Sequence, residues 1–274
     1  MSKELKIKLD KRSKLLRKNI ARALLSANRG HFGSSMSLVE ILRVLYDHIV
    51  YFNPKKPKDK KRDRIILSKG HGCLALYSIL SDKKFFKADE FEDFLKLDSI
   101  LGGHPESDKV PGVEASTGAL GHGLPIAVGI ALSLKLKKSK SKVYVIVGDG
   151  ELNEGSNWEA MMSANKYKLN NLKIIIDYNK IQSYDFVKNV IDLEPLNKKL
   201  SSFGFDVSEV NGHDVKALKK NFMKFKNSNL KKSSVTICHT IKGKGFKSAE
   251  NNPTWHHRNS FTKDEIKMIK KSLN

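Results

Sequence analysis

Residues 143–182 read VYVIVGDGELNEGSNWEAMMSANKYKLNNLKIIIDYNKIQ, and this stretch decides the fold. Residues 143–147 are an unbroken apolar run rich in β-branched side chains, and residues 172–177 contain a second such run. Strands buried on both faces of a parallel sheet have this composition. We therefore predict a strand, a tight turn, a helix over residues 154–167 and a second strand, in that order.

Polar residues stand where each of these strands ends. Gly148-Asp149-Gly150 ends the first strand, and its two glycines let the backbone turn sharply and approach a bound group. Asn179 follows the second strand. Because open α/β sheets bind ligands beyond the carboxyl ends of their strands, we expect Asp149 and Asn179 to meet there.

The oxygen atoms near this turn predict a metal site. The Asp149 carboxylate, the Asn179 amide and the main-chain carbonyl of Ile181 would form a partial oxygen shell suited to Mg²⁺ or Ca²⁺, which a diphosphate would extend. The motif therefore predicts a metal-bridged diphosphate. A dinucleotide site is a weaker interpretation, because the glycines form G-x-G-x4-G with the third one misplaced. A simple turn is the remaining interpretation of GDG.

Size and charge limit the possible classes of protein. The length of 274 residues suits one large α/β domain, and we expect a single domain over residues 1–274. The net charge of +22 could indicate a nucleic-acid-binding protein. The basic clusters are scattered, however, and lack interleaved aromatic residues. We therefore expect solvated surfaces that steer anionic substrates, and no nucleic-acid partner.

The sequence shows no sign of a disulfide framework or a membrane span. Cys73 and Cys238 are the two cysteines and form no C-x-x-C motif. Residues 1–16 lack an apolar signal core, and the longest apolar tract, residues 124–134, is too short to cross a bilayer. We expect a cytoplasmic protein without a membrane partner.

The rest of the chain alternates helices with strands. Periodicity predicts helices over residues 10–27 and 37–49, the second opened by a capping box of Ser37 and Glu40. Further strands are predicted at residues 65–67, 206–210 and 234–238, with helices at residues 73–80, 120–136 and 195–203 and a helix ending near residue 227. This alternation predicts an α/β fold with a doubly wound, mainly parallel sheet and helices on both faces.

Histidines and glycines gather in the connecting loops. His31 lies in GHFG between the first two helices, and His71 follows a strand in SKGHG. His71 could donate a hydrogen bond to a phosphate, with a helix N-terminus behind it. Taken singly, each of these two histidines is more simply a surface or turn residue. His104 lies in the glycine-rich segment 102–123, where the backbone of residues 118–121 could approach a flat ligand.

Together these motifs resemble the transketolase family, specifically its N-terminal half, which binds the diphosphate of thiamine diphosphate. Five motifs stand in the family's order: GHFGSSMS, SKGHG, GGHPE, STGALGHG, and GDG with NKI. The similarity covers nearly the whole chain. It implies the diphosphate-binding domain of the thiamine diphosphate-binding fold, with thiamine diphosphate and Mg²⁺ (or Ca²⁺) as cofactors.

The resemblance also implies residue roles. His31, His104 and His256 match the catalytic histidines that contact the donor sugar and transfer protons. Glu154 and Glu159 match family acids, with Glu154 near the dimer contact. The metal ligands would be Asp149, Asn179 and, by its carbonyl, Ile181. Cofactor-binding positions would be His71, Gly118, Ala119, Leu120, Gly148, Asp149, Gly150, Glu154, Asn179, Ile181, Lys244 and His256.

Some positions depart from the family's pattern. Phe32 and Ala119 replace common prolines, and His122 stands where many long transketolases have glutamine. These substitutions suggest the split-subunit branch. In the family, the glutamate that activates the cofactor's aminopyrimidine ring lies in a pyrimidine-binding domain, which we expect, with the C-terminal domain, on a separate subunit.

The resemblance thus predicts the N-terminal subunit of a split transketolase. Such an enzyme transfers a two-carbon ketol unit from a ketose or ketose phosphate to an aldose. We expect activity with a separate C-terminal transketolase subunit, in a heterotetramer, on sugar or sugar-phosphate substrates.

Two other interpretations stay open. The first is another thiamine diphosphate enzyme that decarboxylates pyruvate and joins the product to an aldehyde, as deoxyxylulose-phosphate synthase does. ELNEG after GDG and the GHPE loop favour transketolase instead. The second is a noncatalytic protein on this fold that holds RNA through its basic surface. Retention of Asp149, Asn179 and the three histidines argues against it.

Overall fold

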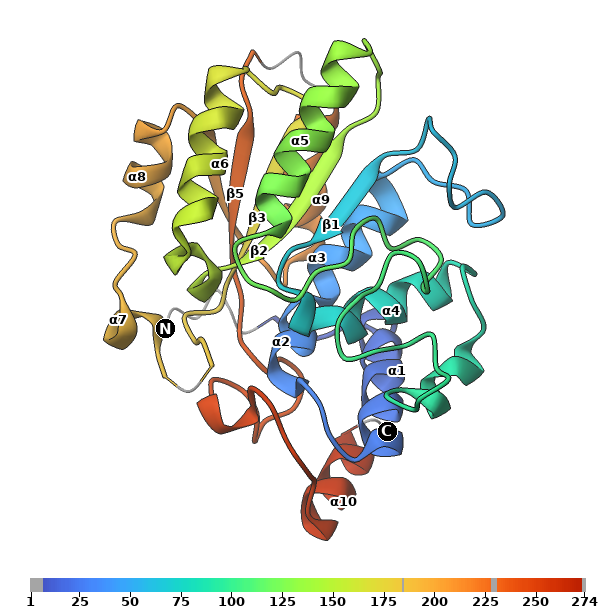
Figure 1. Ribbon diagram of the computed structural model, residues 1–274. Coiled ribbons are helices and arrows are strands. Elements are labelled where there is room, and N and C mark those ends of the chain that lie inside the picture. The colour runs from blue at the N-terminus through green and yellow to red at the C-terminus, as the bar shows by residue number, and fades with distance from the viewer. Residues whose placement is uncertain (1–6, 184, 228–230, 273–274) are drawn as a thin grey trace.

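A computed structural model describes residues 7–183, 185–227 and 231–272 (Figure 1). Its five-stranded sheet has the order β1-β2-β3-β5-β4, and every neighbouring pair is parallel. The prediction of a parallel α/β sheet is confirmed, and every predicted strand is present. The strands are β1 (Arg64–Leu67), β2 (Val143–Gly148), β3 (Leu172–Tyr178), β4 (Asp206–Asn211) and β5 (Ser234–His239).

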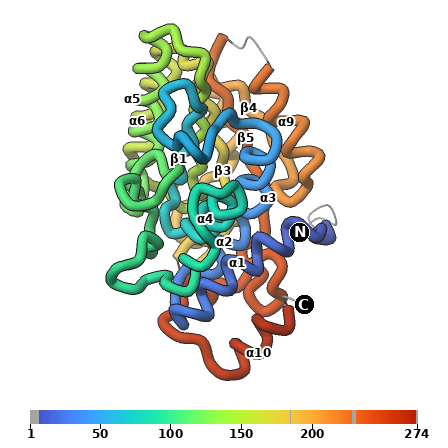
Figure 2. Tube along the Cα trace, turned by 90° about the vertical axis from the view of Figure 1, so that its right-hand side faces the viewer, coloured from blue at the N-terminus to red at the C-terminus, as the bar shows by residue number. Residues whose placement is uncertain are grey.

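Helices cover both faces of the sheet, as predicted. Figure 2 shows α5 and α6 on one side of the strands and α9 on the other. Successive side chains of β2 alternate between two cores: Val145 packs with the α5 and α6 side, and Tyr144 with the opposite side. A strand that supplies both cores is apolar throughout, which explains its continuous apolar run. The main helices are α1 (Lys11–Ala27), α3 (Val39–Val44), α4 (Cys73–Asp82), α5 (Gly123–Leu136), α6 (Gly155–Lys166), α8 (Leu196–Ser202) and α9 (Val215–Asn227).

One further helix and several short segments were not predicted. α10 (Lys263–Ser272) packs its buried Ile269 into the core that also contains Leu16 of α1. In the described part of the chain, no helix combines the length and the apolar character needed to cross a membrane. The short segments are α2 (Phe32–Ser37), η3 (Gly70–Gly72), η4 (Ala88–Asp93), η5 (Gly150–Asn153), α7 (Val187–Val190) and η6 (Pro253–Trp255). The helix predicted over residues 37–49 is present as α3 and the π-helical η2 (Leu45–Ile49).

The predicted capping box of Ser37 and Glu40 is wrong. The helical region begins earlier, with α2 at Phe32. The Ser37 hydroxyl donates to Asp177 at 2.7 Å, and the Glu40 carboxylate lies 2.6 Å from Arg17. Both side chains are drawn into buried polar contacts with distant parts of the chain. Local spacing could not reveal those partners.

Candidate active site

A cavity of about 220 Å³ lies beyond the carboxyl ends of β1, β2, β3 and β5. Segments that follow these strands supply much of its lining, as expected for a parallel sheet. The cavity brings Asp149 and Asn179 together with the three predicted catalytic histidines. Its lining residues are His31, Lys69, His71, His104, Gly118, Leu120, Gly148, Asp149, Gly150, Glu151, Asn179, Ile181, Gln182, Ser183, Lys242 and His256. We call it the cofactor cavity.

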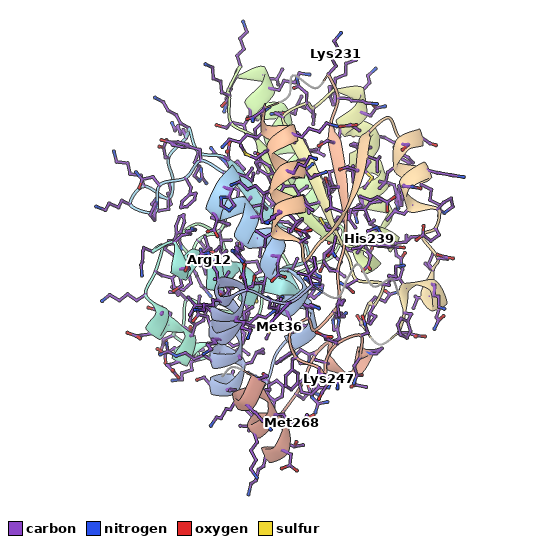
Figure 3. The ribbon with its side chains drawn as sticks, turned by 180° about the vertical axis from the view of Figure 1, so that it is seen from behind. Arg12, Met36, Lys231, His239, Lys247 and Met268 are labelled. Carbon is purple, nitrogen blue, oxygen red and sulfur yellow. The ribbon has the colours of Figure 1, made fainter. Side chains whose placement is uncertain are left out.

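A larger cavity, of about 730 Å³, lies beyond the ends of β3, β4 and β5. Asn179 lines both cavities. His239 lines the larger one and lies at the end of β5 (Figure 3). None of the predicted catalytic histidines belongs to its described lining. Size therefore does not identify the site here, and chemistry favours the smaller cavity.

A buried glutamate that was not predicted shapes the turn after β2. The Glu151 carboxylate accepts hydrogen bonds from the backbone N–H groups of Gly148 and Gly121 at 3.0 and 3.1 Å. It also accepts one from the Ser68 hydroxyl at 2.5 Å. Burial raises the pKa of Glu151 despite these donors. Glu151 thus ties the ends of β1 and β2 to the glycine-rich loop.

The three predicted metal ligands line the cofactor cavity. The Asp149 carboxylate accepts hydrogen bonds from two backbone N–H groups, one of them at 2.8 Å. The Asn179 amide nitrogen donates to Asp177 at 3.2 Å, and its Oδ1 accepts the Ile181 N–H at 3.1 Å. This pair of bonds defines the orientation of the amide. A carboxylate, an amide oxygen and a main-chain carbonyl are ligands that suit Mg²⁺ or Ca²⁺.

Asp149 and Lys242 are buried in this cavity with incomplete charge compensation. Burial, followed by repulsion from Asp177, raises the pKa of Asp149 to about 6. Burial, followed by repulsion from Lys69, lowers the pKa of Lys242 to about 7. The Lys242 ammonium donates to the Ile181 carbonyl at 2.8 Å. That carbonyl oxygen therefore already faces a cation, and it has a second lone pair for a metal.

Five imidazole rings form the neighbouring wall, and we call them the histidine cluster. The His31 centroid lies 5.4 Å from those of His71 and His256, 5.8 Å from that of His104 and 4.5 Å from that of His257. Burial is the main cause that lowers the pKa of His31 to about 3 and of His256 to about 2. It also lowers the pKa of His71 and His104. These four rings are therefore neutral at neutral pH, each with one N–H donor and one acceptor nitrogen.

Three residues predicted to bind the cofactor lie outside the described lining of this cavity. Lys244 Nζ lies 3.9 Å from Glu250, and Lys242 projects into the cavity in its place. The KGKG motif contains both lysines, so its spacing alone could not distinguish them. Glu154 is exposed at the N-cap of α6, and Ala119 lies between two lining residues.

Two departures from the family's pattern have different surroundings. Phe32 is buried in an aromatic group, with its ring centroid 5.1 Å from those of Phe246 and Trp255. These contacts explain how a large side chain is accommodated beside His31. His122 is exposed immediately before α5, which begins three residues later than predicted.

Behind the cofactor cavity, Asp177 is buried among hydrogen-bond donors. Its Oδ2 accepts from the Lys69 ammonium at 2.5 Å and from the Ser37 hydroxyl at 2.7 Å. The Thr240 hydroxyl donates to its Oδ1. Burial alone would raise the pKa of Asp177, but the Lys69 charge and these bonds outweigh burial and hold it below its ordinary value. A carboxylate at the end of an apolar strand was the sequence signal for this residue.

A second buried ion cluster anchors the loop after β5. Arg17 donates to Glu40 at 2.6 Å and to the Lys244 carbonyl at 2.8 Å. His213 Nδ1 lies 2.8 Å from Glu40, and its Nε2 accepts the Ile241 N–H at 2.8 Å. Because Nε2 accepts, the proton shared with Glu40 is on Nδ1. We call the two clusters the supporting layer, which comprises Arg17, Ser37, Glu40, Lys69, Asp177, His213 and Thr240.

With this geometry established, comparison with known proteins identifies the family. A family model described as "Transketolase, thiamine diphosphate binding domain" matches residues 11–274. The chain belongs to this family. An apulose-4-phosphate transketolase subunit of Actinobacillus succinogenes is 43% identical over 253 residues, covering 91% of this chain and 90% of that protein. A 6-deoxy-6-sulfo-D-fructose transketolase subunit of a Clostridium species is 34% identical over 254 residues, covering 93% and 92%.

A solved transketolase shares the fold. The crystal structure of the Campylobacter jejuni enzyme matches this family member with a TM-score of 0.88 and 32% sequence identity. The match covers 96% of this chain and 42% of that one. This chain therefore spans about two-fifths of the length of that solved transketolase, whereas it spans nine-tenths of the Actinobacillus protein.

Proposed function

We propose that this chain is the N-terminal subunit of a thiamine diphosphate- and metal-dependent transketolase. The enzyme transfers a two-carbon ketol unit from a ketose or ketose phosphate to an aldose. One observation carries the proposal: Asp149 and Asn179 line a single cavity with His31, His104 and His256. The transketolase subunits named among the relatives support it, and their named sugars carry a phosphate or a sulfonate.

The metal in this proposal is Mg²⁺, or Ca²⁺, held by Asp149, Asn179 and the Ile181 carbonyl. In the described part of the chain, no group of three His, Cys, Asp or Glu residues could hold a metal. The donors that fit are one carboxylate, one amide oxygen and one carbonyl, which are hard ligands that leave positions for diphosphate oxygens. The raised pKa of Asp149 supports the same assignment, because a bound cation would favour its ionised form.

The diphosphate would lie between the turn after β2 and the start of α4. His71 and the Gly150 backbone would contact it, and α4, which begins at Cys73, would add the partial positive charge of its N-terminus. Lys242 lines the same cavity and would balance part of the remaining negative charge, whereas the Lys69 ammonium is already paired with Asp177 at 2.5 Å. The glycine-rich loop would lie along the ligand at Gly118 and Leu120, which also line this cavity.

Thiamine diphosphate, when bound, supplies a carbanion for addition to a ketose carbonyl. The histidines of this chain would orient the sugar and move its protons. Since the pKa of His31 is about 3, its neutral ring can accept a hydrogen bond from a sugar hydroxyl at neutral pH. The Nδ1 atom of the neutral His256 ring lies 2.7 Å from Lys242 Nζ and accepts from that ammonium, so its Nε2–H would donate to the sugar. His104, whose pKa is also lowered by burial, would add a third neutral ring.

The two acidic residues in the described lining of the cofactor cavity, Asp149 and Glu151, both have other roles. Asp149 is assigned to the metal, and Glu151 accepts three hydrogen bonds that shape the turn. The glutamate that the family uses at the aminopyrimidine ring would therefore come from a partner. We propose that residues 1–274 form one domain and that a separate C-terminal subunit supplies the pyrimidine-binding half, in a heterotetramer.

The free, buried thiols of Cys73 and Cys238 support a cytoplasmic location.

Reconstitution tests this function. The purified chain should give no ketol transfer from a ketose phosphate by itself, and it should become active when mixed with the C-terminal subunit, thiamine diphosphate and Mg²⁺. Asp149→Ala should stay inactive in the same mixture. Robust ketol transfer by the chain alone would overturn the split-subunit proposal. A complex that uses pyruvate and no ketose would instead indicate a decarboxylating carboligase.

A further inference from the structure

A second cavity, of about 370 Å³, adjoins the cofactor cavity at the histidine cluster. His31, His71 and His104 line both cavities. Besides these three rings, the lining of the second cavity includes the apolar side chains of Leu74, Phe94 and Leu95, and it also includes Arg29 and Asn259. Its volume is in the range of small-molecule sites, which are mostly apolar with a few placed polar groups. A ligand that reacts in the cofactor cavity can therefore extend past the histidines toward Arg29.

Arg29 sets the charge of this second cavity. Among the described residues of its lining, Arg29 is the one arginine or lysine, and none is an aspartate or glutamate. A guanidinium stays charged at physiological pH, whereas the neighbouring His31 has a pKa of about 3 and carries no charge there. Arg29 is exposed and has neither an ion pair nor a hydrogen bond from its side chain within the described ranges. The lining of this cavity thus offers one cation without a carboxylate beside it.

The backbone holds Arg29 in place while its side chain is left free. α1 ends at Ala27, its C-cap Asn28 has a left-handed φ of 52°, and Gly30 has a φ of 133°. The Gly30 N–H donates to the Arg258 carbonyl at 2.9 Å, and the Arg258 N–H donates back at 3.0 Å. A Cβ on Gly30 would lie 2.8 Å from Leu24 Cδ2. The sequence Asn-Arg-Gly therefore turns the chain sharply and places the arginine at the cavity.

We propose that Arg29 binds the anionic group at the far end of the sugar substrate, while the reacting end lies among the histidines. That group is a tetrahedral oxyanion, either a phosphate ester or a sulfonate, which the guanidinium fork matches through paired N–H donors. The inference rests on the proposed ketol transfer and adds that this chain itself selects anionic sugars. Arg29 acts on specificity and takes no part in the chemical step.

The kinetic test uses the reconstituted complex and three ketose donors that differ in one group. These are D-fructose 6-phosphate, 6-deoxy-6-sulfo-D-fructose and D-fructose, with glycolaldehyde as a neutral acceptor. Arg29→Met should lower kcat/KM for the anionic donors by about 10- to 100-fold, chiefly through KM, and leave D-fructose unchanged. A comparison of the two anionic donors shows whether the phosphate or the sulfonate is preferred. Arg29→Lys keeps the positive charge and should retain part of the preference for anionic donors.

A matched control separates a local contact from long-range attraction. Lys18 is exposed on α1 and is not among the residues that line the second cavity. Lys18→Met removes the same charge and should preserve the preference for anionic donors. If Arg29→Met lowers kcat/KM equally for D-fructose and for the anionic donors, or changes neither, the inference is overturned.

A binding measurement separates this inference from the proposed function. The full chain, with thiamine diphosphate and Mg²⁺, is titrated with D-fructose 6-phosphate while the imidazole NMR signals of His31 and His257 are followed. The wild-type signals should shift, and the affinity should fall at least about tenfold in Arg29→Met. A complex without ketol transfer would overturn the proposed function, whereas equal affinities of wild type and variant would overturn the role of Arg29.

Discussion

The cofactor cavity and the supporting layer behind it bury charged groups to a similar degree but compensate them differently. In the cavity, burial moves the pKa of Asp149 up and that of Lys242 down, so both shift toward their neutral forms. In the layer, the pKa of Asp177 and of Glu40 is lowered, because cationic partners outweigh burial. The layer is therefore electrostatically complete by itself. The cavity is incomplete, and such perturbed groups mark a place where a ligand supplies the missing charge.

The largest expected effect comes from breaking the supporting layer. Asp177→Ala leaves the buried Lys69 ammonium without its carboxylate and should lower the free energy of unfolding by about 3–5 kcal/mol. Urea unfolding at neutral pH without cofactor measures it. Asp149→Ala is the matched control, and it should cost clearly less, because two backbone N–H groups lose their acceptor but burial already disfavours the ionised carboxylate. Equal losses in the two variants would contradict the comparison.

The next effect appears in ligand binding. Asp149→Ala should weaken Mg²⁺-dependent binding of thiamine diphosphate by at least about 100-fold, because a metal ligand is lost. Calorimetric titration with Mg²⁺ and with a chelator measures the affinity. Asp264→Ala removes an exposed carboxylate from α10 and serves as the control that should bind normally. Unchanged affinity in Asp149→Ala would count against the metal assignment.

A smaller, pH-dependent effect is expected at Glu40. Since its pKa is lowered from 4.5, its stabilising contribution is present above pH 4.5 and is lost as the pH falls below that value. Glu40→Gln keeps an acceptor for Arg17 and should lower the free energy of unfolding by about 1–3 kcal/mol at neutral pH. Urea unfolding across this pH range should show the difference from wild type shrinking in acid. A difference that does not change with pH would show that the carboxylate charge is not responsible.

The smallest effect concerns one donor to Asp177. Ser37→Ala removes one hydrogen bond and leaves the Lys69 pair, so it should cost about 1 kcal/mol. Thermal unfolding measures the loss. Ser202→Ala is a suitable control, because that exposed hydroxyl donates to the Lys198 carbonyl of its own helix. A loss as large as that of Asp177→Ala would mean that Lys69 contributes little to the layer.

The sequence predicted the parts of this molecule that depend on local composition. β2 and β3 are continuous apolar runs because both faces are buried, so their positions and the meeting of Asp149 and Asn179 could be inferred. Asp177 could not be assigned a role, because its partners Lys69 and Thr240 come from other strand ends. Such contacts depend on sheet register, which pairs Asp177 with Gly148 on one side and Cys238 on the other.

The same limit applies at the chain's C-terminal side. α10 has an amphipathic pattern but few apolar residues, and what identifies it is the packing of Ile269 against the α1 core. The choice of Lys242 over Lys244 depends on a loop that Arg17 and His213 hold by its backbone. Neither the packing of Ile269 nor the choice between the two lysines can be predicted from the spacing of residues along the chain.

The bridge between Gly30 and Arg258 also has a consequence for synthesis of the protein. It joins the loop of His31 to the segment of His256. This wall of the site can therefore form only after the segment of His256 has left the ribosome. Protein chains emerge N-terminus first, and the sheet residues precede this segment. A nascent or prematurely terminated chain that ends soon after β5 can carry all five strands and still lack this wall of the site.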